Sequence, residues 1–239
     1  MVIIKGDIHK VIKTLESNSI DLLYVNPPFA MTGAEWDKAL DWNVLWTDIW
    51  RVVKNNGAVV IHSTQRFTML LASSQLKNFR YKYTWVKNTN TNFFLCKKQP
   101  LRRCEDVLVF YKEPPTYNPQ MIGDEFHKKR VVMYGGKEKY YGNDKAHTDN
   151  WGHETNVGGH NGRYPNDLLE YSIKKGKGNA STRPNELIEF FIKTYSNKGD
   201  AVLDITCYGA ETGIVCDYLE REYIGIDLDP QVEYDYTDF

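Results

Sequence analysis

Four consecutive residues in the first part of the chain carry groups that can recognise a planar amine. Asn26-Pro27-Pro28-Phe29 directly follows the apolar run Ile20–Val25. The Asn26 side-chain oxygen and the Pro27 carbonyl are acceptors, and Phe29 offers a flat apolar ring. Two prolines stiffen the backbone around them. Fixed acceptors beside a ring suit a planar group with an exocyclic NH2, such as a nucleobase, although the same residues also fit a plain strand-ending turn.

Apolar runs of strand length alternate with segments of helical spacing along most of the chain. Strands are expected at 2–4, 20–25, 58–62, 81–86, 106–111, 201–205 and 223–227, and helices at 8–15, 44–54, 66–77, 184–195 and 212–219. This alternation predicts a parallel-rich sheet with helices on both faces. Ligands bind beyond the carboxyl ends of strands in such sheets, and Asn26 stands at one of these ends.

The alternation stops between 112 and 163, where Gly, Pro, Asn, Tyr and His are frequent and periodicity is weak. A structureless loop of that length is unusual inside a compact core, so this segment is predicted to be an inserted module. We therefore divide the chain into 1–111, the insertion 112–163, and 164–239. The first and last parts are expected to form one domain.

Charge is unevenly distributed in a chain of 239 residues whose net charge is −1. Residues 77–103 contain eight Lys or Arg and no acid, whereas residues 199–239 contain eleven acids and one Arg. Such asymmetry favours a partner that is a polyanion. The four cysteines lack metal spacing and are expected to be buried, reduced thiols of a cytoplasmic protein, or of the host cytoplasm or nucleoid if it is viral. No apolar stretch approaches the roughly 20 residues of a membrane span.

Several motifs in order resemble the amino-group DNA methyltransferases that use S-adenosylmethionine. Asn26-Pro27-Pro28-Phe29 resembles their signature of Asp, Asn or Ser followed by Pro-Pro and an aromatic residue. The similarity continues through Trp36-Asp37 and nearly the whole chain, most weakly at 112–160. The further stretches that carry it are LRRCEDVLVFYK (101–112), RYPNDLLEYS (163–172), STRPNELIEFFIKTYSNKGDAVLD (181–204) and YIGIDLDP (223–230).

The resemblance implies a Rossmann-like methyltransferase fold with a mostly parallel seven-stranded sheet and a target-recognition insertion at 112–163. The catalytic loop precedes the cofactor strands, which is the β-type, circularly permuted order of the family. That order also distinguishes the chain from the protein-glutamine methyltransferases, which share Asn-Pro-Pro-aromatic. With both termini between the second and third parent strands, we expect so short a chain to be complete.

The resemblance implies that Asn26, Pro27, Pro28 and Phe29 are catalytic. Asn26 and the Pro27 carbonyl would accept both hydrogens of a base amine, and Phe29 would stack on a base turned out of double-stranded DNA. Asn in the first position resembles the adenine-N6 enzymes, whereas cytosine-N4 enzymes more often have Ser there. We therefore expect an adenine-N6 DNA methyltransferase, of the kind found in restriction–modification, with cytosine N4 as the alternative.

Residues assigned to S-adenosylmethionine by the same resemblance lie at the ends of the later strands. They are Asp7, Asn26, Ser181, Arg183, Asp204, Thr206, Tyr208, Gly209, Thr212 and Asp227. Asp227 follows Asp204 by 23 residues, the spacing of a ribose-binding acid. The chain departs from the family in this loop, because Tyr208 and Ala210 replace two expected glycines and Glu211 adds a carboxylate. A non-catalytic DNA-binding relative or subunit is therefore a second hypothesis.

The acid-free stretch 77–103 interleaves basic and aromatic residues, a mixture that binds phosphates and stacks on bases. Its strongest phosphate candidates are Lys97, Lys98, Arg102 and Arg103. A strand with a buried apolar side and solvated lysines explains Tyr81, Tyr83 and Trp85 equally well. The histidines at 127, 147, 153 and 160 lack zinc spacing, so no metal is expected. A homodimer or a partner subunit is consistent with the resemblance.

Overall fold

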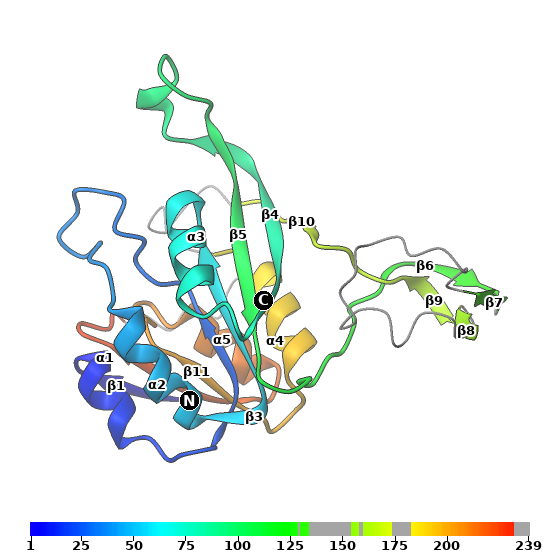
Figure 1. Cartoon of the computed structure of the whole chain (residues 1–239), viewed down its shortest axis with the longest axis horizontal. Helices are drawn as coiled ribbons and strands as arrows, with labels where there is room; N and C mark the ends of the chain where they lie inside the picture. Colours follow the sequence, from blue (N-terminus) through cyan, green and yellow to red (C-terminus); the bar gives the residue numbers. More distant parts are fainter. Residues whose placement is uncertain (129, 134–153, 158–159, 174–182, 232–239) are drawn as a thin grey trace. The chain divides into compact units, whose positions relative to one another are not determined.

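One sheet of eight strands organises the computed structural model, which describes residues 1–128, 130–133, 154–157, 160–173 and 183–231. The strand order is β1-β12-β11-β2-β3-β5-β4-β10 (Figure 1). Its members are β1 (Val2–Lys5), β2 (Ile20–Val25), β3 (Val53–Ser63), β4 (Phe79–Thr91), β5 (Arg102–Phe110), β10 (Leu168–Glu170), β11 (Ala201–Asp204) and β12 (Glu222–Asp227).

The sheet is mostly parallel, as predicted. Only β5 runs against its neighbours β3 and β4, and the other pairs are parallel. The predicted number of strands was seven, and the eighth is β10, which adds to β4. Strand β10 has three residues, of which only Leu169 is buried, so its sequence shows no apolar periodicity. Strand β2 lies beside β11 although β11 comes much later in the chain, which is the permuted order.

Helices cover both faces of the sheet. On one face lie α1 (Ile8–Val11), the 3-10 turn η1 (Ile12–Thr14), α2 (Trp42–Val52) and α3 (Gln65–Ser74), and on the other α4 (Asn185–Tyr195) and α5 (Glu211–Tyr218). Each layer buries its own apolar cluster against the sheet, so β2 and β3 are apolar on both sides. Within the described residues, no helix is long and apolar enough to cross a membrane.

Local signals explain where α2 begins and ends. The Asp41 carboxylate accepts hydrogen bonds from the Asn43 and Val44 amides and caps the helix at its start. The helix was predicted at 44–54 but ends at Val52, because Val53 already pairs with Ile20 of β2. Sheet pairing therefore overrides helical periodicity in the last two predicted helical residues.

Residues 119–165 form a compact unit apart from the rest of the chain. It contains two small antiparallel pairs, β6 (Ile122–His127) with β9 (His160–Arg163) and β7 (Arg130–Met133) with β8 (Glu154–Val157). Short polar strands of this kind leave little periodic pattern in the sequence. Ser181, and the histidines at 147 and 153, lie outside the described residues.

Candidate functional site

The first four residues after β2 leave the sheet at its carboxyl edge. Asn26, Pro28 and Phe29 are partly exposed, and Pro27 is buried. The Phe29 ring packs on Phe67 of α3, with ring centroids 5.5 Å apart. Because β1, β12, β11 and β2 are parallel neighbours, their carboxyl ends place Asp7, Asp227, Asp204 and Asn26 along one edge. Three of the residues predicted for the cofactor therefore lie along the same edge as Asn26.

Arg183, just before α4, fixes the Asn26 side chain. Its Nη2 donates to Asn26 Oδ1 at 2.7 Å, and Arg183 is 7% exposed. A carbonyl oxygen has two lone pairs and can accept from two donors. Arg183 was predicted to hold the cofactor, and that stays a prediction; its contact with Asn26 orients the first residue of the loop after β2.

Glu105 of β5 supplies the counter-charge for this arginine and for a second buried cation. One carboxylate oxygen lies 2.7 Å from Arg183 Nη2, and the other accepts from Lys87 Nζ at 2.7 Å. Both cations also lie over the Trp85 ring, with 5.2 Å for Arg183 and 5.7 Å for Lys87. Buried charges are tolerated only when paired, so Glu105 holds this group together.

A neutral histidine completes the support beneath the loop. Burial and the nearby Arg183 charge hold the pKa of His62 well below its usual range. Its Nδ1 accepts from Arg183 Nε at 3.3 Å, which leaves the ring proton on Nε2 facing the Tyr24 hydroxyl at 2.7 Å. Burial also raises the pKa of Tyr24. Asn26 thus rests on a chain of polar contacts that reaches into the core.

Asp37 anchors the segment that follows Phe29. Its carboxylate accepts from the amides of Ala30, Met31 and Thr32 and from the Thr32 hydroxyl, at 2.6–2.9 Å. Burial acts to raise the pKa of Asp37, but the hydrogen bonds from Thr32, Ala30 and Met31 outweigh it and lower this pKa. Asp37 therefore fixes the end of the loop after β2, a role that its match to the family motif did not specify.

The loop after β11 has left-handed backbone conformations at two positions that are not glycine. Tyr208 has φ 33° and Ala210 has φ 59°, and these are the two positions at which glycine was expected. The left-handed region costs other residues about 1–2 kcal/mol each. Gly209 between them has an ordinary φ, so no local shift moves the glycine into either position.

Acidic groups surround this loop. Asp227 accepts from the Tyr208 amide and from the Asp229 amide, both at 2.9 Å. Burial raises the pKa of Asp204 to about 7, against hydrogen bonds from Thr206 and Thr212 that lower it. Asp7 accepts from the His9 amide, and the Gly6 amide donates to the Asp227 carbonyl. The Thr206 hydroxyl donates to the Asn26 carbonyl at 3.2 Å, which joins this loop to the loop after β2.

These residues fit a nucleoside cofactor with a cationic end. The left-handed turns keep the backbone close to the strand ends, as a ligand-binding glycine loop does. Asp227 and Asp7 follow two neighbouring strands at the edge where such ligands bind. Tyr208 is 48% exposed, so its side chain turns outward instead of filling the core behind the loop.

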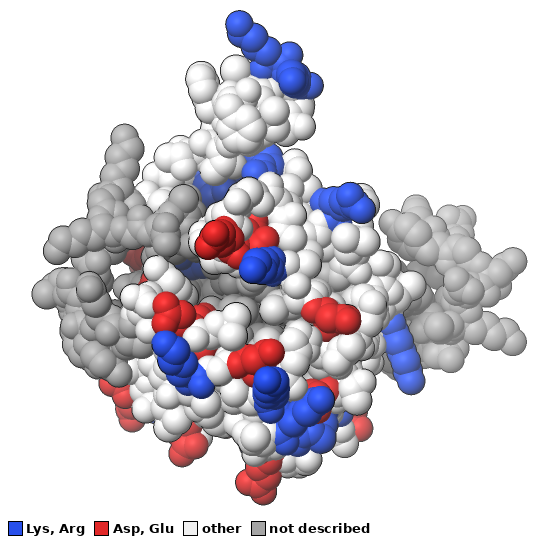
Figure 2. Space-filling view, turned by 90° about the vertical axis from the view of Figure 1, so that its left-hand side faces the viewer, with Lys and Arg blue, Asp and Glu red and all other residues white. Residues whose placement is uncertain are grey.

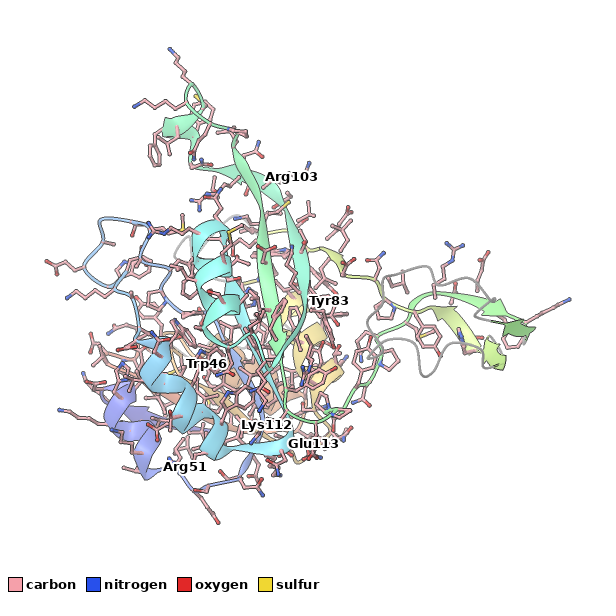
Figure 3. All side chains as sticks on the ribbon, in the orientation of Figure 1. Trp46, Arg51, Tyr83, Arg103, Lys112 and Glu113 are labelled. Atoms are coloured by element: carbon pink, nitrogen blue, oxygen red, sulfur yellow. The ribbon has the colours of Figure 1, made fainter. Side chains whose placement is uncertain are left out.

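The predicted DNA-contact residues lie on the β4–β5 hairpin. Lys97 and Lys98 are exposed near its tip. Arg103 Nε donates to the Lys87 carbonyl, and Arg102 Nη1 lies 3.9 Å from Met31 Sδ. In Figure 3 Arg103 marks the hairpin and Tyr83 lies nearer the body of the sheet. Tyr83 and Trp85 face the core, as the strand explanation predicted, whereas Tyr81 is 36% exposed.

Two expectations about single residues were wrong. Lys87 was expected to be solvated but is 3% exposed, because it shares the inward side of β4 with Tyr83 and Trp85. Cys96 and Cys104 are exposed, since they lie on the hairpin beyond the core, while Cys207 and Cys216 are buried. Among the described residues, no cluster of His, Cys, Asp or Glu is arranged for a metal.

Sequence reasoning missed Glu105, Lys87 and His62. For Lys87 a signal was present, because Tyr83, Trp85 and Lys87 recur at every second residue and so face the same side of a strand. Glu105 also had one, because it is the first acid after the acid-free residues 49–104. Nothing in the sequence around His62 marks it as a partner of Arg183.

Curated relatives match nearly the whole chain. The type II methyltransferase M.HpaI of Haemophilus parainfluenzae is 25% identical over 93% of this chain and 68% of its own length. The DNA adenine methyltransferase YhdJ of Escherichia coli K12 is 23% identical over 96% of this chain and 79% of its own.

Solved structures share the fold. The cytosine-N4-specific PvuII DNA methyltransferase has a TM-score of 0.69 at 16% identity, covering 98% of this chain and 86% of that one. The M1.HpyAVI–SAM complex has a TM-score of 0.59 at 22% identity, covering 95% and 94%. The model of the N6_N4_Mtase family, described as DNA methylase, matches residues 20–237. With this match over most of its length, the chain belongs to the N6_N4_Mtase family of DNA methylases.

Proposed function

We propose that the protein is an S-adenosylmethionine-dependent DNA methyltransferase that modifies the N6 amine of an adenine turned out of the duplex. The observation that carries this is the oriented Asn26 carboxamide at the carboxyl end of β2, joined through Thr206 to the loop after β11. Adenine is supported by Asn in the first motif position. It is also supported by a relative whose name is DNA adenine methyltransferase.

The cofactor would lie along the carboxyl ends of β11, β12 and β1. Asp227 and Asp7 would bind its ribose and adenine ends, and the loop 204–212 would hold its amino-acid end. The residues proposed there are Asp204, Thr206, Tyr208, Gly209, Thr212 and, from the segment before α4, Ser181. When bound, the cofactor supplies a methyl group already activated on a sulfonium.

The catalytic loop would act by accepting hydrogen bonds. The lone pair of an exocyclic base nitrogen is delocalised into the ring, so this nitrogen is a poor nucleophile. Asn26 Oδ1 and the Pro27 carbonyl would each accept one of its hydrogens and favour the pyramidal geometry of attack. Preorganised acceptors of this kind cost no rearrangement during the reaction. Phe29, with Pro28 fixing its backbone, would stack on the base.

Arg183 and Glu105 would set the direction of the Asn26 oxygen. Because a guanidinium only donates, it selects the oxygen of the carboxamide and turns the NH2 group away. Glu105 fixes Arg183 in turn and balances part of the positive charge near the reacting amine. Both are positioning residues, since they act through Asn26.

DNA would be held through the basic hairpin and read by the insertion. Lys97 and Lys98 are exposed, while Arg102 and Arg103 lie where the hairpin leaves the sheet. Phosphate contacts fix the register of a duplex, and base-edge contacts supply the sequence preference. We assign the second task to residues 112–163.

A DNA-binding protein without methyl transfer is the second candidate, favoured by one observation. Tyr208 and Ala210 occupy left-handed positions that the family fills with glycine. This candidate predicts DNA affinity without cofactor affinity, whereas the leading proposal requires both.

Nucleoside mass spectrometry tests the proposal directly. Genomic DNA from a methylation-deficient host contains every short sequence, so it is a substrate whatever the recognition site. Incubation with the protein and S-adenosylmethionine should yield N6-methyladenine, and omission of the cofactor should yield none. Detection of N4-methylcytosine instead would show that cytosine, and not adenine, is the target base. DNA binding with neither methylated base nor calorimetric heat on addition of S-adenosylmethionine would leave only the second candidate.

A further inference from the structure

The β4–β5 hairpin ends in an ordered tip instead of a loose loop. The last strand pair is Thr91 with Arg102. Asn92 then takes a left-handed conformation with φ 57°, and its Oδ1 accepts from the Arg102 amide at 2.8 Å. The 3-10 turn η2 (Phe93–Leu95) follows, and the amides of residues 95, 96, 98 and 99 all bond to carbonyls within the tip. The hairpin rises beyond the sheet in Figure 1.

The surface of this tip is aromatic and basic. Phe93 is 74% exposed and Phe94 is 85% exposed, side by side in η2. Lys97 and Lys98 are exposed beside them. Figure 2 shows the blue of Lys and Arg at the tip, at the top of the view. Exposure of two neighbouring phenylalanine rings to water is unfavourable, because the free energy of burying them is not gained. Exposed apolar patches of this kind often mark a surface that is covered on binding.

The tip lies at the catalytic edge of the sheet. Strands β4 and β3 are both antiparallel to β5, so β4 is parallel to β3 and to β2 and runs toward the edge where Asn26 emerges. By the register Lys82 lies level with Val25, and β4 continues past that level to Thr91. Lys87 of β4 contacts Glu105 in the network below Asn26. From Lys87 to Thr91 is four residues, or about 13 Å of strand at ~3.3 Å each. The two rings therefore stand beyond the catalytic loop on the same side.

We propose that Phe93 and Phe94 form an aromatic wedge that enters the base stack of duplex DNA beside the base to be methylated. This rests on the proposed function and names the part of the duplex that the hairpin contacts. Lys97 and Lys98 next to the rings neutralise phosphates, while an ordered turn presents the rings with little conformational entropy to lose. Apolar wedges elsewhere unstack and kink duplexes, and this unstacking would favour extrusion of the neighbouring base.

Unwinding of closed circular DNA tests the wedge. Relaxed plasmid is incubated with a topoisomerase and enough protein to saturate it, the protein is removed, and topoisomers are separated. The wild type should shift the linking number. The variant F93A/F94A should lose most of that shift and bind DNA about fivefold or more weakly, as expected for a lost aromatic stack. Variant M69A/L70A truncates exposed apolar side chains of α3 (Met69 76%, Leu70 55%) and should behave as the wild type.

Each other outcome contradicts the wedge. An unchanged linking number with wild-type protein at saturation, or an equal shift with F93A/F94A, excludes insertion. Loss of self-association in sedimentation of F93A/F94A without DNA would show that the rings contact a second copy of the chain instead. Failure of the proposed function is separate, because unwinding needs neither cofactor nor methyl transfer and would persist in a protein that only binds DNA.

Discussion

The loops after β2 and after β11 leave the same edge of the sheet but are held in different ways. Side chains from distant elements hold the first: Arg183 fixes Asn26, Phe67 packs on Phe29, and Asp37 binds the segment beyond. In the second, the backbone itself adopts left-handed turns at Tyr208 and Ala210, and Asp227 accepts from the Tyr208 amide.

This difference explains which residue types can change in each loop. Under the proposed function, the side chains of the β2 loop would carry the chemistry, so that loop depends on its residue types. The β11 loop would act through its backbone shape, and Tyr or Ala can take the place of Gly at a cost in strain. Substitutions should therefore affect the rate of methyl transfer in the first loop and stability in the second.

The largest effect is expected for Asn26→Ala. Removing the oriented acceptor should lower methyl transfer about 10³-fold, as for other preorganised hydrogen-bonding groups. DNA affinity should stay near that of the wild type, because Asn26 lies apart from the basic hairpin. Incorporation of labelled methyl groups into unmethylated genomic DNA measures the first quantity, and filter binding measures the second.

Asn26→Asp is the matched control, since a carboxylate keeps both the acceptor and the partner of Arg183. It should retain part of the activity. Turnover of Asn26→Ala at the wild-type rate would show that the β2 loop is not the catalytic one. The proposed difference between the two loops would then be wrong.

Glu105→Gln should have the next largest effect, on stability. Without the carboxylate, Lys87 and Arg183 remain buried with side chains 4% and 6% exposed and lack their counter-charge. Breaking a buried pair in this way costs about 3 kcal/mol of unfolding free energy. Urea unfolding measures it, and methyl transfer should fall with it as Asn26 loses its orientation.

Glu189→Gln makes the same substitution in a partly exposed helix pair with Lys193. It should cost no more than about 0.5 kcal/mol. Equal losses for the two variants would mean that Glu105 is an ordinary surface ion pair, and the β2 loop would then not depend on support from the core.

Asp204→Asn should change how stability depends on pH. Burial raises the pKa of Asp204 from its ordinary value of 3.8 to about 7 in the folded protein. Between these pH values the unfolded chain has released the proton and the folded protein has not. This residue therefore lowers stability by up to about 1.4 kcal/mol per pH unit as pH rises from ~4 to ~7.

The difference between wild type and Asp204→Asn isolates this contribution from that of other carboxyl groups. Urea unfolding at pH 5, 6 and 7 should show the wild type losing stability relative to the variant as pH rises. If the stabilities of wild type and variant changed with pH in the same way, the pKa of Asp204 would not be raised in the folded protein. Its carboxyl group would then lie in polar surroundings.

The sequence was sufficient for the sheet and for the strand ends that carry Asn26, Asp204 and Asp227, because buried parallel strands are long apolar runs. It could not show that Arg183 turns toward Asn26, since that contact joins residues 157 positions apart. Nor could it give β10, whose three residues form a strand only by adding to β4.

The β11 loop shows the opposite limit. The sequence correctly marked Tyr208 and Ala210 as departures from a glycine pattern. Residue types alone do not reveal whether the chain adjusts its backbone or keeps it, and Gly209 in the middle allowed either outcome. The positive φ values on both sides of Gly209 show that the turn is kept.

Ala210→Gly gives the smallest effect and tests whether that turn is strained. Ala210 has φ 59°, where glycine is free of the steric cost that alanine carries. Glycine also gives the unfolded chain more conformational entropy, which offsets part of this gain. The variant should therefore be more stable than the wild type by about 0.5–1 kcal/mol in urea unfolding. Ala72→Gly in α3 makes the same substitution in right-handed helix and should lower stability by about 0.5–1 kcal/mol. Opposite signs for the two variants would establish that the β11 loop holds its shape against the preference of its residues, and equal losses would show that it does not.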